Sequence, residues 1–152
     1  MESSTHRHMK AVVREELEKE GFGVIEEPLL PPAKWISWST YRPDLLGFRA
    51  ADMAEEVAVV ECETRPSMRR FVAKNYSSLW FQPSVLSVGS LRRILAVPRG
   101  KLGAVDLRLR QGWEIWVIGI DGPLEKIRPL GGQPTASSPS SRIGGRRSLC
   151  ST

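Results

Sequence analysis

The 152 residues of the chain suffice for one domain with a hydrophobic core and are too few for two domains of typical size. With 41% hydrophobic and 26% charged residues, the composition is that of a globular protein, and no run of 18 apolar residues suggests a transmembrane helix or a membrane partner. The N-terminus is polar and lacks the apolar core of a secretory signal, which favours a cytoplasmic protein.

The net charge of +5 is unevenly distributed along the chain. Residues 1–64 hold seven basic and 13 acidic side chains, whereas residues 65–110 hold ten basic side chains and one acidic side chain. A basic segment attracts polyanions, because each neutralised phosphate releases counterions. The same charges can instead serve to solvate helix faces. Charge alone does not decide between these two interpretations.

The first half of the chain predicts a helix followed by three strands. Apolar residues recur at helical spacing over 8–20, and Gly21 provides a C-terminal stop. Strands are expected at 22–25 and 41–48, with a proline-rich loop between them. The clearest strand is 57–63, whose nearly unbroken apolar start predicts a central position with both faces covered.

The second half predicts alternating helices and strands. Pro66 suits the first turn of a helix that continues to about Leu79. A strand at 94–97, a short helix at 102–110 and a strand at 113–120 follow. The order helix, three strands, helix, strand, short helix, strand predicts an α/β fold with a central mixed sheet flanked by helices.

The expected organisation is one domain with two flanking segments. Residues 1–7 are expected to be a flexible N-terminus, and 8–130 to form the α/β domain. Residues 131–152 are rich in Ser, Pro, Gly and Arg and bury too little apolar surface to fold, so a disordered basic tail is predicted.

Three carboxylates stand close to strand ends. Asp44 follows Arg42-Pro43, and Glu61 and Glu63 face the same side of the next strand because side chains alternate along it. If the two strands pair, Asp44 lies beside the glutamates. Such a cluster is costly unless a cation, a proton or a basic group neutralises it. Carboxylate oxygens suit Mg²⁺, which binds one or two carboxylates and retains several waters.

Pro43-Asp44 and Glu61-Cys62-Glu63, on consecutive strands, resemble the motifs of the PD-(D/E)XK nuclease superfamily. This restriction-endonuclease-like fold includes archaeal Holliday junction resolvases. The resemblance implies hydrolysis of phosphodiester bonds in DNA with Mg²⁺ or Mn²⁺. Because resolvases and many restriction enzymes act as dimers, it also favours a homodimer.

The resemblance assigns roles to individual residues. Asp44 and Glu61 would be metal ligands together with the backbone carbonyl of Cys62. A glutamate on the first helix often completes the family's site, and Glu15 or Glu16 could serve here. Pairing of Glu15 with Lys19 one turn away explains Glu15 equally simply.

The third motif position departs from the family, because Glu63 stands where the family has a lysine. Glu63 could act as general base or as ligand to a second metal. It could instead be an exposed strand end paired with Arg65. A basic side chain of the following helix, Lys74 or Arg70, could supply the missing positive charge.

The alternative to an enzyme is a catalytically inactive module with the nuclease fold that binds nucleic acid or a protein partner. Both hypotheses use the same basic side chains for nucleic-acid contacts. These are Arg65, Arg69, Arg70, Lys74, Arg92 and Arg93. His6 and His8 are assigned to the flexible N-terminus, with a proton-relay role as the minor alternative.

Overall fold

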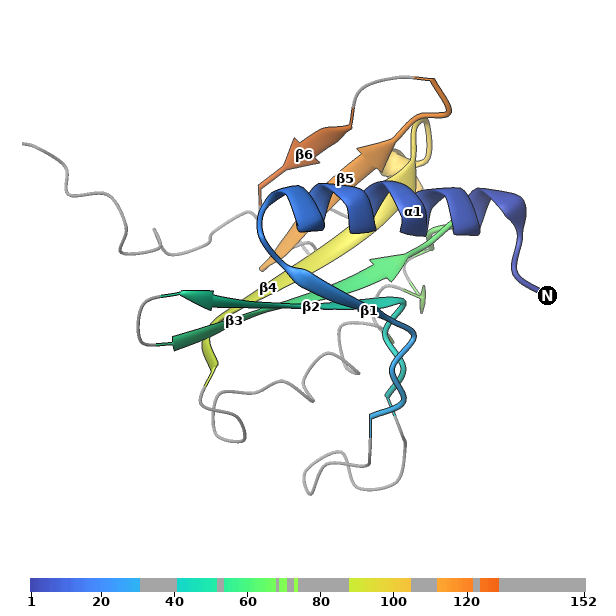
Figure 1. Cartoon of the computed structure of the whole chain (residues 1–152). Coiled ribbons are helices and arrows are strands. Elements are labelled where there is room, and N and C mark those ends of the chain that lie inside the picture. Colours follow the sequence, from blue (N-terminus) through green and yellow to red (C-terminus); the bar gives the residue numbers. More distant parts are fainter. Residues whose placement is uncertain are drawn as a thin grey trace, which may run out of the picture.

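The computed structural model places a helix, α1 (Ser4–Lys19), across one face of a six-stranded mixed sheet (Figure 1). It describes residues 1–30, 41–51, 54–67, 69–70, 73, 88–104, 112–121 and 124–128. Lys74, most of the predicted helices at 66–79 and 102–110, and the predicted tail at 131–152 lie outside the described residues.

The six strands follow one another across the sheet in chain order, from β1 to β6. They are β1 (Gly23–Glu26), β2 (Leu45–Ala51), β3 (Ala54–Cys62), β4 (Val88–Pro98), β5 (Trp113–Ile118) and β6 (Glu125–Ile127). The central strands β3, β4 and β5 are parallel, and the remaining pairs are antiparallel. A short 3₁₀ helix, η2 (Leu102–Ala104), follows β4. The prediction of an α/β fold with a central mixed sheet is confirmed.

Helix α1 begins four residues earlier than its apolar pattern predicted. The side chain of Ser3 caps the helix, because its hydroxyl accepts a hydrogen bond of 3.2 Å from the backbone N–H of His6. At the other end, Gly21 has φ of 94°, which a residue with a Cβ rarely adopts, and the chain turns there into β1. The earlier start brings residues 4–7 into the helix.

The sheet separates two apolar layers. Met9, Val13 and Leu17 of α1 pack on the face that carries Val60 and Trp116. The opposite face carries two further clusters. They contain Tyr41, Leu46, Val57 and Val59, and Leu95, Val97, Trp113, Ile115 and Val117. Every residue from Val57 to Glu63 is buried, so the prediction that this strand is covered on both faces is confirmed.

Strands β3, β4 and β5 end at a common edge of the sheet, which we call the carboxyl edge. Residues 63–67, 99–101 and 119–121 leave the sheet there, and β2 begins there because it runs antiparallel to β3. The N-terminal half of α1 lies over the same edge (Figure 1). The carboxyl ends of strands in α/β sheets are the usual place for ligands.

The packing of α1 gives a direct test of the fold. Leu17→Ala should lower the free energy of unfolding by about 2–5 kcal/mol, because the fully buried side chain leaves a cavity against the sheet. The exposed neighbour Lys19 provides the control, and Lys19→Ala should change the free energy by no more than about 0.5 kcal/mol. Urea unfolding measures both, and equal effects would contradict this packing.

Candidate functional site

Asp44 is held against the backbone of β3. It directly precedes β2, whose first residue Leu45 pairs with Val60. The Asp44 carboxylate accepts a hydrogen bond of 2.6 Å from the backbone N–H of Cys62. The Pro43-Asp44 and Glu61-Cys62-Glu63 segments, 17 residues apart, therefore meet at the carboxyl edge. This part of the sequence-based prediction is confirmed.

The second oxygen of Asp44 faces α1. His6 Nε2 lies 3.3 Å from Asp44 Oδ1, and His6 Nδ1 lies 2.8 Å from Glu2 Oε1. The imidazole thus bridges two carboxylates. The assignment of His6 to a flexible N-terminus was wrong, because the predicted helix start was too late. Ser3 as an N-cap is the signal that would have extended the helix to His6.

Glu61 is completely buried on the face of the sheet opposite α1. The hydroxyl of Tyr41 donates a hydrogen bond of 2.7 Å to its carboxylate. Burial, and next the negative charge of Glu61, raise the pKa of Tyr41 well above its ordinary value. The phenol of Tyr41 therefore keeps its proton in the alkaline range and can donate the hydrogen bond to Glu61.

Glu63 is also buried, at 7% exposure, and its carboxylate lies 3.4 Å from the guanidinium of Arg70. The alternative of an exposed strand end was wrong. A hydrogen bond of 2.9 Å from its backbone N–H to the carbonyl of Ala96 continues the ladder beyond β3 and keeps Glu63 between the strands. The expected approach of Arg70 to this position is confirmed.

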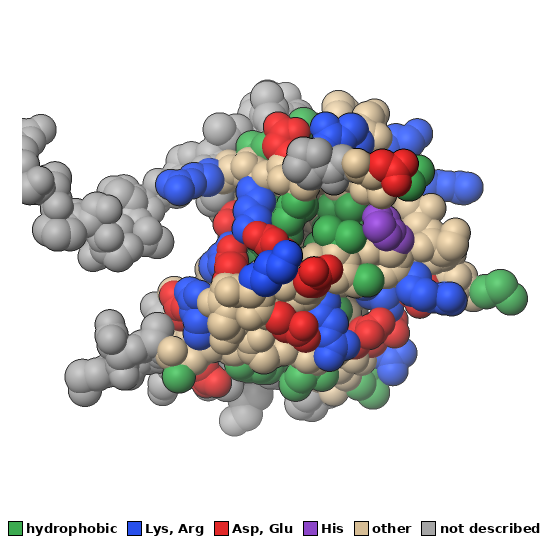
Figure 2. All heavy atoms as spheres, turned by 45° about the horizontal axis from the view of Figure 1, so that its top comes forward, with side chains coloured by type: hydrophobic (Ala, Val, Ile, Leu, Met, Phe, Trp, Pro, Cys, Tyr) green, Lys and Arg blue, Asp and Glu red, His purple; other side chains and the backbone are tan. Residues whose placement is uncertain are grey.

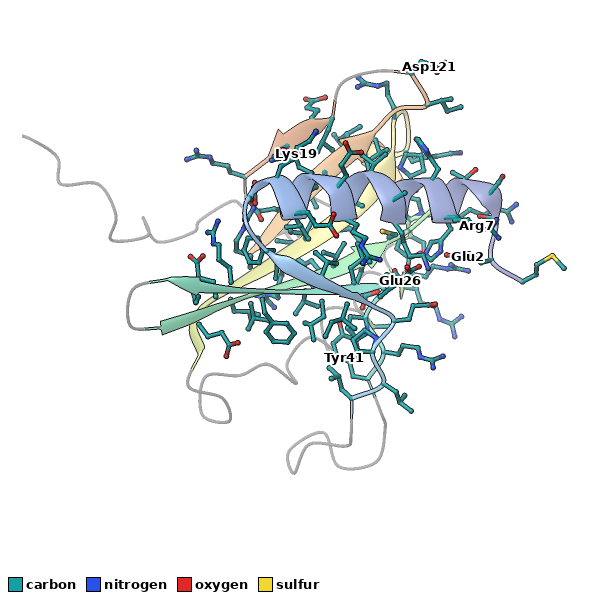
Figure 3. The ribbon with its side chains drawn as sticks, viewed as in Figure 1. Glu2, Arg7, Lys19, Glu26, Tyr41 and Asp121 are labelled. Carbon is teal, nitrogen blue, oxygen red and sulfur yellow. The ribbon has the colours of Figure 1, made fainter. Side chains whose placement is uncertain are left out.

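A buried lysine lies beside this group of charges. Lys10 Nζ is 2.6 Å from Glu2 Oε1 and 2.7 Å from Glu26 Oε1. Burial lowers the pKa of Lys10, but the hydrogen bonds to the two glutamates raise it more, so the ammonium stays charged. Figure 3 shows Glu2 and Glu26 near the N-terminal half of α1, with Tyr41 on the far side of the sheet. Lys10 thus fixes the N-terminus of the chain to the end of β1.

Cys62 faces the α1 side of the sheet, where it is part of the core. Burial is the main cause that raises the pKa of its thiol well above the ordinary value, and the carboxylates of Asp44 and Glu61 raise it further. The side chain is therefore a neutral thiol. Its backbone, and not its sulfur, belongs to the candidate site.

Glu15 does not reach the carboxyl edge. It lies nine residues beyond His6, about 13 Å along the helix, and its side chain is 71% exposed and 3.4 Å from Lys19. Within the described ranges, no three side chains of the kinds that bind metals are grouped around one point. Asp44 meets the backbone of Cys62, whereas the carboxylate of Glu61 is buried under Tyr41, so any cation held by both would need only one or two protein carboxylates.

The structure separates the predicted nucleic-acid contacts into two groups. Arg92 is held within the protein, with Nε and Nη2 each 3.0 Å from the carboxylate of Glu114 and Nη1 2.7 Å from Glu20. Arg93 is half-buried, with its guanidinium 5.4 Å from the centre of the Trp113 ring. Both side chains contact the sheet itself.

Other basic side chains are exposed at the carboxyl edge, and we call them the basic rim. Its members are Arg42, Arg65, Arg69, Arg70, Arg99 and Lys101. They come from the segments before β2, after β3 and after β4, which the antiparallel pairing of β2 with β3 and the parallel pairing of β3 with β4 place at the same edge. The predicted contacts Arg65, Arg69 and Arg70 therefore lie beside the motif carboxylates.

No protein-family model, curated protein or solved structure matches the chain. The likeness to PD-(D/E)XK nucleases accordingly rests on the two motifs and their meeting point. Among the described residues, no helix is both long enough and apolar enough to cross a membrane.

The ion pairs of Arg92 predict a pH-dependent stability. Burial raises the pKa of Glu20, but hydrogen bonds from Arg92 and Lys126 lower it more, so its pKa is below the ordinary 4.5. A carboxylate with a lowered pKa stabilises the folded protein above pH 4.5, and this stabilisation is lost as the pH falls through the pKa of the folded state. Arg92→Ala should cost about 1–3 kcal/mol at pH 7 and less at pH 3, measured by urea unfolding.

Arg69→Ala is the matched control, since Arg69 is exposed in the basic rim. Its effect on unfolding should stay within about 0.5 kcal/mol at both pH values. An Arg92→Ala variant as stable as the Arg69→Ala variant at pH 7 would show that the Arg92 ion pairs contribute nothing.

Proposed function

We propose that the chain binds DNA along its carboxyl edge and hydrolyses phosphodiester bonds there with Mg²⁺ or Mn²⁺. One observation supports this most: Asp44 meets the backbone of Cys62, which directly follows Glu61, at the edge where the basic rim is exposed. One DNA substrate could then contact a cation held by the acidic groups and, through its phosphates, the neighbouring basic groups. The PD-(D/E)XK resemblance supplies the reaction type and the preference for DNA and for a homodimer.

The basic rim supplies the attraction for the phosphate backbone. Its six side chains are exposed and come from three separate segments, so they can contact several successive phosphates. At the opposite end of the sheet, charges of both signs pair within the protein, as with Arg92, Glu20 and Glu114. Figure 2 shows basic and acidic side chains interleaved on the face that it displays. The exposed side chains of the basic rim are therefore the proposed contacts for a polyanion.

Asp44 and Glu61 would hold the cation, and each is oriented by a neutral donor. The N–H of Cys62 fixes one oxygen of Asp44, and the hydroxyl of Tyr41 fixes one oxygen of Glu61. A bound Mg²⁺ supplies a Lewis acid that polarises a phosphate and lowers the pKa of a water. The orientation of the Asp44 carboxylate is thus fixed by the backbone of β3, and that of the Glu61 carboxylate by the phenol of Tyr41.

Arg70 could provide the positive charge that Glu63, at the third motif position, lacks. Glu63 cannot stabilise developing negative charge, but Arg70 lies 3.4 Å from its carboxylate and has a largely exposed guanidinium. The pair brings a positive charge to the position that a lysine occupies in the resembling family. Glu63 then orients Arg70, and the guanidinium faces the phosphate.

A second candidate is a module that binds nucleic acid without cleaving it. It is favoured by the internal neutralisation of the carboxylates, since Glu61 is fully buried under Tyr41 and Glu63 is paired with Arg70. Asp44 likewise accepts from Cys62 and adjoins His6. Binding by the basic rim is common to both candidates, and only cleavage separates them.

Cleavage is tested with linear, branched and single-stranded DNA in the presence of Mg²⁺ or Mn²⁺. Asp44→Asn and Glu61→Gln should each lower the rate at least about 100-fold, because a cation ligand is lost. Glu15→Gln is the control and should keep the wild-type rate, since Glu15 is exposed far from the edge. DNA binding without metal-dependent cleavage by the wild type would favour the second candidate, and equal rates in all variants would contradict the assigned ligands.

Binding is tested by fluorescence anisotropy with labelled DNA over a series of salt concentrations. The double variant Arg65→Ala/Arg69→Ala should bind more weakly and reduce the slope of log K against log salt by about 2, since each phosphate contact contributes about 0.9. Lys19→Ala, at the far end of α1, should leave the slope unchanged. An unaltered slope in the double variant would remove the basic rim from the interface.

A further inference from the structure

A cavity of about 470 Å³ lies at the carboxyl edge, beyond the ends of β4 and β5 and against the N-terminal half of α1. It is lined by Thr5, His8, Met9, Pro98, Arg99, Ile118, Gly119, Ile120 and Asp121. Its volume falls within the range of about 300–1,000 Å³ that is usual for small-ligand sites. None of the residues in the two motifs contributes to it.

The lining combines apolar walls with a few polar groups. Met9 and Ile118 are buried members of the core, whereas Ile120 exposes 86% of its surface beside the cavity. His8 is held at the wall, with Nε2 3.4 Å from the carbonyl of Gly119. Figure 2 shows a hollow in which hydrophobic side chains lie next to a histidine. Such a site suits a flat ring that is apolar on its faces and polar at its edges.

The position of the cavity relates it to the motif carboxylates. Cys62 at the end of β3 pairs with Ala96 of β4, and neighbouring strands lie about 4.8 Å apart. Glu61 pairs with Leu95, so Arg99 leaves β4 four residues, about 13 Å, further along the strand. Asp44 is linked to the cavity more directly, because its contact His6 follows the lining residue Thr5 on α1. A nucleic-acid strand that meets Asp44 can therefore extend over the first turns of α1 to the cavity.

We propose that this cavity is a nucleobase site, which takes one base of the bound nucleic acid between Met9, Ile118 and Ile120. The inference rests on the proposed function, which it deepens by assigning a base subsite at the same edge of the sheet as the motif carboxylates. Thr5, Arg99 and Asp121 at the lining offer donors and an acceptor to the edge of the base. The phosphate of the same nucleotide lies toward Arg99 and Lys101 of the basic rim.

The test compares AMP with ribose 5-phosphate, which lacks the base, by isothermal titration calorimetry of the full chain without divalent cations. AMP should bind at least about tenfold more tightly, because its base removes apolar surface of the cavity from water. Thr5→Tyr, which fills the cavity from an exposed position on α1, should abolish this advantage, and Ile120→Ala should reduce it. Leu29→Ala changes another exposed hydrophobic residue and should leave it intact.

Equal affinity for AMP and ribose 5-phosphate, or an advantage of AMP that survives Thr5→Tyr, would overturn the nucleobase site. The measurement requires no catalysis, so its failure is distinguishable from that of the proposed function. If DNA is bound and cleaved while AMP has no advantage, only the subsite is wrong. If AMP has the advantage but DNA is neither bound along the basic rim nor cleaved, the proposed function falls and the cavity remains a mononucleotide site.

Discussion

The hydrogen bond from the Cys62 N–H to the carboxylate of Asp44 joins the two sequence segments on which the candidate site depends. It forms where the β2–β3 ladder ends at the pair Leu45 and Val60, so the side chain of Asp44 takes the place of the next backbone carbonyl. A buried backbone N–H requires an acceptor, and this requirement holds the carboxylate at the edge of the sheet. The meeting of the motifs is thus a consequence of strand pairing.

Basic side chains of one charged segment acquire different roles through their place in the sheet. Arg92 projects from the middle of β4 toward α1, where Glu20 and Glu114 use its donors. Arg69 and Arg99 follow strand ends, where the chain leaves the sheet and its side chains meet solvent. The ion pairs of Arg92 stabilise the fold, whereas the charges after the strand ends lie at the surface. Net charge along the sequence does not distinguish them, because both kinds are arginines.

Local sequence patterns correctly predict several secondary-structure elements. The strand 57–63 was recognised from its apolar run, and burial of both its faces follows from its central place in the sheet. Helix α1 was recognised from its period, but its first turn was missed because Ser3 caps a polar stretch that carries no apolar signal. That missed turn contains His6, so an error at a helix boundary concealed a contact of Asp44. For the candidate site, the first turn of α1 is therefore more important than the rest of the helix, because it carries His6.

By itself, the sequence determined the α/β class, the place of Glu61 and Glu63 at the end of a central strand and the one-turn relation between Glu15 and Lys19, because each depends on periodicity over a few residues. Only the tertiary structure decided that Tyr41 covers Glu61, that Arg70 reaches Glu63 and that a cavity opens beside β4 and β5. These features join segments that are distant or separated by a turn. Their geometry follows from sheet order and helix packing, which no local pattern encodes.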